Sequence, residues 1–266
     1  MPYIEVNERK LHYADSHPQG APAGGLTFIC IHGLGSSQNY YFPILPFLTG
    51  KHRCITFDTY GSGRSPYTGH EQFVETIAAD VLGILDKLSL AKAVVVGHSL
   101  GGTVVSYLAA QFPERVRAVV AIGPVHPTPS NTPVFEKRIQ VVSESGMEPM
   151  ADSIPNQATG SRSTPLQKAF IRELILAQNS VGYASLCKVV VTARVPNYAA
   201  VKAPFLLIAG DEDKSAPLDG CRHIFDNIAS QNKRLEVLPG VGHWHCIEAS
   251  DDVGRLIADF ASTISP

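Results

Sequence analysis

The sequence of 266 residues contains few cysteines, a single tryptophan and almost no excess of charge of one sign. Its five cysteines are odd in number and scattered, and no two of them form a C-x-x-C pair. We therefore expect free thiols rather than a disulfide framework. The net charge of −2 and the pI near 6.5 provide no electrostatic attraction for nucleic acid or for an anionic membrane. We expect neither as a partner.

Long apolar runs are also missing. No stretch is long and apolar enough to span a bilayer. Near the amino terminus, Glu5, Glu8, Arg9 and Lys10 stand where a secretory signal would need an apolar segment. We therefore expect a cytoplasmic protein. The hydrophobic content of 44% is enough for this chain to bury one sizeable core.

Short apolar runs alternate with helical patterns along much of the chain. Between 71 and 88, for example, apolar residues recur at helical spacing. Such alternation predicts an α/β fold with a mostly parallel, eight-stranded sheet flanked by helices. The expected strands are 3–6, 10–13, 26–31, 53–58, 93–96, 116–122, 203–210 and 234–238.

The alternation stops in the segment 126–202, where only helical signals remain. Asn131-Thr132-Pro133 and Ser163-Thr164-Pro165 each combine a capping residue with a proline at a first helical turn. We expect about four helices here, inserted after the sixth strand as a lid over the strand ends. The core would then consist of 1–125 and 203–266. The alternative is that the segment only thickens one side of the core.

A candidate nucleophile lies at a predicted strand-to-helix junction. Ser99 is the centre of Gly97-His98-Ser99-Leu100-Gly101, directly after an apolar strand and before a helix. A serine on such a sharp turn has strained backbone angles and an exposed hydroxyl, and the flanking glycines leave room for the turn. This context predicts a nucleophilic serine.

The partners of such a serine should follow in the order acid, then histidine. Asp213 and His243 lie after two further predicted strands, at the edge where open α/β sheets place their reactive groups. Asp211 is the rival candidate for the acid and His245 for the base. We favour Asp213, which would orient His243, while His243 would take the proton of Ser99.

Backbone amides are the expected stabilisers of negative charge in the transition state. Glycines in His32-Gly33-Leu34-Gly35 allow the chain to turn back over the strand ends with its amides pointing inward. We expect the N–H groups of Leu34 and Leu100 to form an oxyanion hole. This chemistry requires no metal ion or organic cofactor.

Together these motifs resemble the α/β-hydrolase superfamily. The matching pieces are His32-Gly33, 58–65 (DTYGSGRS), the turn at Ser99, 210–213 (GDED) and Gly242-His243 with Glu248 after it. Within the superfamily the chain looks like small esterases and lactonases, notably the 3-oxoadipate enol-lactonases. The resemblance implies a serine hydrolase of a small carboxylic ester or lactone that acts through an acyl-enzyme.

Several alternatives stay open. A receptor of the same fold with a retained but slow triad, a carbon–carbon bond hydrolase and an acyltransferase would share these motifs. Tyr40, Tyr41 and Trp244 are candidates for the substrate pocket, although core packing accounts for the two tyrosines equally well. His243, His245 and Cys246 include types of side chain that bind metals, but no second cluster of such residues accompanies them.

Overall fold

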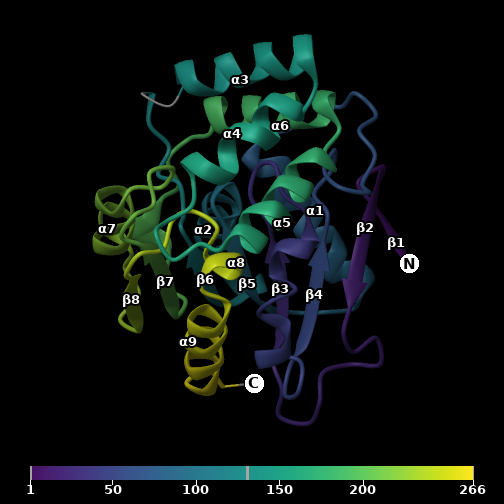
Figure 1. The fold of residues 1–266 in the computed structure, drawn as a ribbon. Coiled ribbons are helices and arrows are strands. Elements are labelled where there is room, and N and C mark those ends of the chain that lie inside the picture. Colours follow the sequence, from purple (N-terminus) through teal and green to yellow (C-terminus); the bar gives the residue numbers. More distant parts are fainter. Residues whose placement is uncertain (1, 130–131, 266) are drawn as a thin grey trace.

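The computed structural model describes residues 2–129 and 132–265, in which eight strands form one sheet (Figure 1). The order is β1-β2-β4-β3-β5-β6-β7-β8, and β3 to β8 are parallel, whereas β1 and β2 are antiparallel to their neighbours. The predicted mostly parallel sheet is therefore confirmed. The strands are β1 (Tyr3–Val6), β2 (Arg9–Asp15), β3 (Thr27–Ile31), β4 (Arg53–Phe57), β5 (Ala93–His98), β6 (Val116–Ile122), β7 (Phe205–Gly210) and β8 (Lys233–Leu238).

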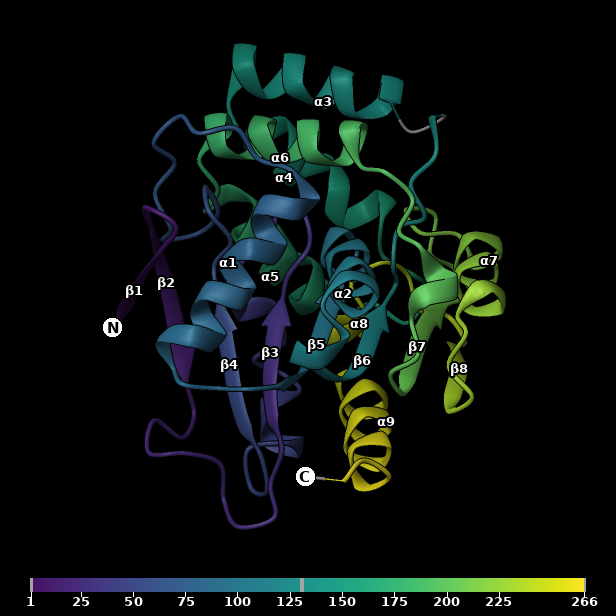
Figure 2. The same cartoon turned by 180° about the vertical axis from the view of Figure 1, so that it is seen from behind.

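Helices cover both faces of this sheet (Figures 1 and 2). One face packs against α1 (Val74–Lys87), α2 (Leu100–Gln111) and α7 (Leu218–Asn227), and the other against α8 (His245–Glu248) and α9 (Ser250–Ser262). Successive strand residues point to opposite faces, so Phe28 and Ile29 join different core clusters. Because both faces are covered, the central strands read as continuous apolar runs.

Four helices lie between β6 and β7: α3 (Thr132–Ser145), α4 (Glu148–Gln157), α5 (Pro165–Leu176) and α6 (Ser180–Thr192). We call them the helical insertion. They lie above the carboxyl ends of the parallel strands (Figure 1). Thr164 caps α5 as expected, whereas the predicted cap Asn131 lies outside the described residues. Pro155 lies inside α4.

Short 3-10 helices complete the architecture: η1 (Gln38–Tyr41), η2 (Leu45–Phe47), η3 (Pro113–Arg115) and η5 (Tyr198–Ala200).

Across the described ranges, no single helix is long and apolar enough to cross a membrane. Only α5 and α6 taken together, with a bend of 99° between them, have the required length and composition.

Parallel strands place their carboxyl ends at one edge of the sheet, and the loops that follow β3, β5, β7 and β8 therefore meet there. We call these the strand-end loops. They carry Leu34, Ser99, Asp213 and His243, respectively. The helical insertion faces the same edge (Figure 1).

Candidate active site

The turn at Ser99 has the strained geometry that its sequence predicts. Ser99 has φ of 56° and ψ of −116°, between the end of β5 and the start of α2. A Cβ atom on Gly97 would lie 2.1 Å from the carbonyl oxygen of Gly101, and one on Gly101 would lie 2.1 Å from that of Ile31. Glycine is required at both positions because strand and helix backbones approach this closely. The turn thus holds the Ser99 hydroxyl at the edge of the sheet.

Ser99, His243 and Asp213 form one chain of hydrogen bonds. His243 Nε2 lies 2.9 Å from Ser99 Oγ, and His243 Nδ1 lies 2.8 Å from Asp213 Oδ2. When Nδ1 donates its proton to the carboxylate, Nε2 is left as an acceptor for the serine hydroxyl. The structure therefore brings together the three residues that the sequence selected.

Asp213 is the better placed of the two candidate acids. It is only 5% exposed, and its Oδ1 accepts hydrogen bonds of 2.8 Å from the amides of Ser215 and Ala216. Burial acts to raise the pKa of Asp213, but the neighbouring His243, His245 and the Ala216 amide outweigh it, and the pKa lies below its usual value. Asp211 is exposed and accepts a 2.7 Å hydrogen bond from the Gly240 amide.

His245, the rival base, lies behind the triad instead of facing Ser99. It is fully buried, and its Nδ1 lies 3.0 Å from the main-chain oxygen of His243. His98 Nε2 lies 2.7 Å from that same oxygen. Both imidazoles therefore donate to one carbonyl group, and burial lowers the pKa of each of them. These two neutral histidines hold the backbone of His243, a role that the sequence did not reveal.

The two residues expected to supply the oxyanion hole lie on segments next to Ser99. Leu100 is the first residue of α2, where helical N–H groups have no acceptor within the helix. Leu34 follows β3 and lines the same cavity as Ser99. The loop after β3 passes close to the turn at Ser99, because a Cβ atom on Gly33 would lie 2.8 Å from Ser99 Cβ. Leu34 and Leu100 thus lie on two segments that meet at the serine.

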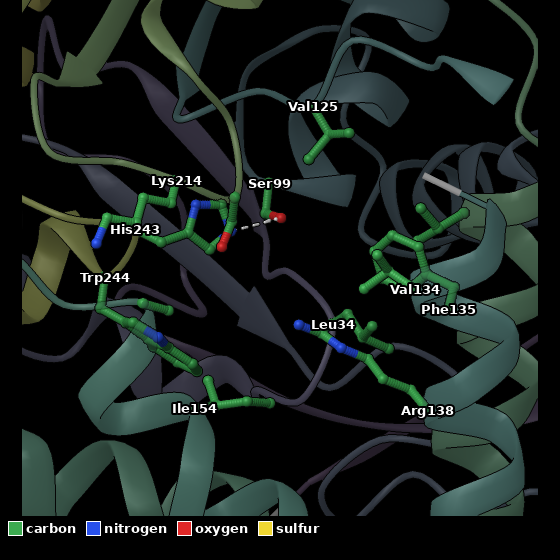
Figure 3. Close-up of a pocket in the computed structure, with 13 residues that line it drawn as sticks. Leu34, Ser99, Val125, Val134, Phe135, Arg138, Ile154, Lys214, His243 and Trp244 are labelled. Carbon is green, nitrogen blue, oxygen red and sulfur yellow. Dashed lines mark hydrogen bonds between the residues drawn. The ribbon is translucent and has the colours of Figure 1, made fainter. Parts of the chain in front are cut away.

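A cavity of about 190 Å³ opens above Ser99 and His243 (Figure 3). Its volume lies below the ~300–1,000 Å³ that is usual for ligand pockets. The strand-end loops supply one side and the helical insertion supplies the other. The lining residues are Leu34, Ser99, Val125, Val134, Phe135, Arg138, Ile154, Ala158, Val190, Lys214, Ser215, His243 and Trp244.

Among the three aromatic candidates for the pocket, only Trp244 lines this cavity. Our expectation for Tyr40 and Tyr41 is corrected by the structure, because both are fully buried in the core. The Tyr40 ring stacks on His98 at 4.1 Å between centroids, and the Tyr41 hydroxyl donates a 2.8 Å hydrogen bond to the Ile31 carbonyl. Because η1 turns inward, the two rings pack below the site.

Glu248 has a structural role that the sequence did not indicate beyond its place five residues after His243. Its buried carboxylate accepts hydrogen bonds from the amides of Gly242 (2.9 Å) and Trp244 (2.8 Å), which flank His243. It also accepts from the Gly160 amide (2.7 Å) and the Ser163 hydroxyl (2.8 Å), between α4 and α5. One carboxylate thus ties the helical insertion to the loop of His243.

The possible metal ligands near the site are separated. His243 faces Ser99, whereas His245 is buried behind Asp213 and Cys246 is buried in the core. Within 2–129 and 132–265, no group of three histidine, cysteine, aspartate or glutamate side chains is placed to hold a metal ion.

Comparisons with known proteins agree with this architecture. A family model for the alpha/beta hydrolase fold matches residues 27–250. The chain is 28% identical to the 3-oxoadipate enol-lactonase 2 of Acinetobacter baylyi, over 83% of this chain and 84% of that one. It is 26% identical to a 2-hydroxy-6-oxo-6-phenylhexa-2,4-dienoate hydrolase of Burkholderia cepacia, over 97% and 95%.

Solved structures give the same result for the fold. The enol-lactonase of Burkholderia xenovorans superposes with a TM-score of 0.88 at 27% identity, covering 98% of this chain and 100% of that one. A thermophilic esterase of Thermogutta terrifontis superposes with a TM-score of 0.90 at 20% identity, over the full length of both chains. The second likeness concerns the fold alone.

Proposed function

The chain belongs to the alpha/beta hydrolase fold family, and from this premise we propose that it is a serine hydrolase of small carboxylic esters or lactones. The hydrogen-bonded chain from Ser99 through His243 to Asp213, at the base of a cavity, is the observation that carries the proposal. The similarity to enol-lactonases at 27–28% identity supports the choice of substrate class.

In the first half of the reaction, His243 Nε2 takes the proton of Ser99 as Oγ attacks the carbonyl carbon of the substrate. Asp213 keeps the proton of His243 on Nδ1 and stabilises the imidazolium that forms. The Leu34 and Leu100 amides bind the tetrahedral oxyanion, and the loss of one such donor typically costs ~3–4 kcal/mol. His243 then gives its proton to the leaving alkoxide, and the acyl group stays on Ser99.

In the second half, a water molecule takes the position of the leaving group. His243 accepts a proton from this water as its oxygen attacks the acyl carbon, and the same amides bind the second oxyanion. Collapse releases the carboxylic acid and returns the proton to Ser99. In a lactone the leaving alkoxide stays attached to the acyl group, so the product is a single hydroxy acid.

The proposal is tested by turnover and labelling of matched serine variants. We expect the wild type to hydrolyse p-nitrophenyl acetate or butyrate, or a small lactone, and to react with a fluorophosphonate at one site. Ser99→Ala should abolish both. Ser143→Ala, an exposed serine of α3 that bonds the Ile139 carbonyl, should abolish neither.

Two other outcomes would change the assignment. Turnover that survives Ser99→Ala would disprove the nucleophile. Labelling of Ser99 without turnover of any ester or lactone would instead favour a receptor of this fold with a slow triad.

A further inference from the structure

The cavity above Ser99 contains a positively charged side chain that the proposed reaction does not use. Arg138 is half-buried on α3 and lines the cavity together with Ser99 and His243. Its guanidinium extends from the helical insertion into the cavity, toward the side where the serine and histidine lie (Figure 3). It therefore faces the space that a substrate would fill.

Arg138 has no carboxylate partner within the described ranges, 2–129 and 132–265. Its guanidinium carbon lies 5.1 Å from the centroid of the Phe135 ring. Other arginines of the chain do form ion pairs: Arg9, Arg53, Arg115, Arg162, Arg172, Arg234 and Arg255. Unlike these seven arginines, Arg138 lines the cavity, so an anion that binds it there would come from outside the chain.

Two other polar groups near Arg138 do not supply a negative charge. Burial raises the pKa of Cys187 to about 12, and it also raises the pKa of Tyr183 well above its usual value, although the charge of Arg138 works against both shifts. The thiol and the phenol are therefore neutral at pH 7. The positive charge of this half-buried guanidinium is therefore not balanced by a negative charge nearby.

The lining of the cavity as a whole favours an anion. Of the described residues that line it, none is acidic, and Lys214 adds a second cation. Most of the other walls are aliphatic or aromatic side chains, which lower the local dielectric and strengthen attraction between charges. This positive cavity lies in a chain with a net charge of −2, so it does not reflect the overall composition.

We propose that Arg138 binds a carboxylate of the substrate, and that the preferred substrates are small esters or lactones that carry this carboxylate apart from the bond that is cleaved. The inference rests on the proposed function and adds its substrate class. The planar guanidinium presents paired donors that match the two oxygens of a carboxylate. The carboxylate is not consumed, so Arg138 contributes orientation and affinity while Ser99 and His243 carry out the chemistry.

Matched substrates that differ only in charge test the assignment. Monoethyl glutarate and ethyl pentanoate share a five-carbon acyl chain, and 5-oxotetrahydrofuran-2-carboxylate and γ-valerolactone share a lactone ring. We expect the wild type to show a higher kcat/KM for the charged member of at least one pair. Arg138→Gln should lower the ratio of charged to neutral kcat/KM roughly 10- to 100-fold, mainly through KM.

Two further substitutions at Arg138 show how the ratio depends on charge and donor geometry, and a substitution at Lys137 is the control. Arg138→Lys keeps the charge without the paired donors and should give an intermediate ratio, whereas Arg138→Glu should lower the ratio below that of Arg138→Gln. Lys137→Gln removes one positive charge from the next residue of α3, which is exposed and does not line the cavity. It should leave the ratio within about twofold. Thermal melting of each variant reports whether it is folded.

Equal kcat/KM for charged and neutral substrates in the wild type, with no change in Arg138→Gln, would overturn the inference while the proposed hydrolase survives. If no substrate is turned over, calorimetry on Ser99→Ala still decides the question of the carboxylate. Monoethyl glutarate should bind more tightly than ethyl pentanoate, and the added Arg138→Gln should remove the difference. Absence of any difference in binding would refute the carboxylate site, whereas failure of fluorophosphonate labelling at Ser99 would refute the hydrolase.

Discussion

The strand-end loops and the helical insertion face each other across one cavity, but they are built on different principles. In the loops, the side chains of Ser99, Asp213 and His243 are buried and form hydrogen bonds with one another. The insertion contributes mainly apolar walls and Arg138, whose guanidinium has no anionic partner among the described residues. A polar side chain whose hydrogen bonds are made within the protein is held in place. A charged side chain without a partner of opposite charge can bind a ligand instead.

This difference assigns separate tasks to the two regions. Reaction chemistry needs groups positioned within a few tenths of an ångström, which buried networks and rigid strand ends can provide. Selectivity needs a surface that meets the variable part of a substrate. We therefore expect changes in the loops to alter kcat or folding, and changes in the insertion to alter the choice of substrate.

The largest effect is expected from the acid in the loops. Asp213→Asn should lower kcat by about 10,000-fold, because an amide favours the wrong tautomer of the histidine and leaves the imidazolium uncompensated. Asp211→Asn is the matched control, since this exposed carboxylate contacts the Gly240 amide and should retain most activity. Steady-state kinetics on one ester compares the kcat of the two variants. A larger loss of kcat in Asp211→Asn than in Asp213→Asn would contradict the choice of acid.

Acidification should also act on the strand ends and on the residues that follow them. Burial lowers the pKa of His32, His98 and His245, so the folded protein keeps them neutral while the unfolded chain takes up protons below about pH 6.5. The contribution of these histidines to the free energy of unfolding should therefore be fully present above pH 6.5. It should decrease as the pH falls toward their lowered pKa values. Each histidine can contribute a loss of up to ~1.4 kcal/mol per pH unit.

Urea unfolding at pH 7.5, 6.5 and 5.5 measures this loss. His245→Gln should make the dependence shallower, because it removes one of these three titrating groups. The helical insertion, α3 to α6, contains no histidine and should not contribute. Stability that rises between pH 7.5 and 5.5 would contradict the expectation.

Glu248 links the two regions, and its removal should affect both. Glu248→Gln leaves at least one of the four donors of the carboxylate without its acceptor, and a lost hydrogen bond to a charged group costs ~1.5–3 kcal/mol. We expect lower thermal stability and faster proteolysis between α4 and α5. Glu173→Gln, on the exposed surface of α5, is the control. If the two variants behave alike, the link through Glu248 is unimportant.

The smallest effect is expected from Tyr40, which lies below the site. Tyr40→Phe removes a hydroxyl that accepts a 3.3 Å hydrogen bond from the Cys246 amide, at a cost of about 1 kcal/mol in stability. Since Tyr40 does not line the cavity, KM should stay within about threefold. Trp244→Phe, which changes a lining residue, provides the comparison and should shift KM more. A larger shift in KM for Tyr40→Phe than for Trp244→Phe would indicate that Tyr40 contacts the substrate.

Much of the fold and of the loop geometry could be predicted because the signals are local. The sequence indicated the strand and helix on either side of Ser99, and its flanking glycines indicated the close backbone approach that the structure contains. The order of Ser99, Asp213 and His243 followed from their places after successive strands. Strand ends of a parallel sheet must converge on one edge, so residues far apart in the chain could be placed together.

The sequence by itself determined the parallel sheet, the turn at Ser99, the order of the three reactive residues and the four helices after β6. Only the tertiary structure decided that Tyr40 packs in the core, that Glu248 joins two regions, and that Arg138 faces the cavity. The physical reason is the range of the interactions. Periodicity and turn chemistry act over a few residues, whereas the direction of a side chain on an inserted helix depends on how that helix packs against distant loops.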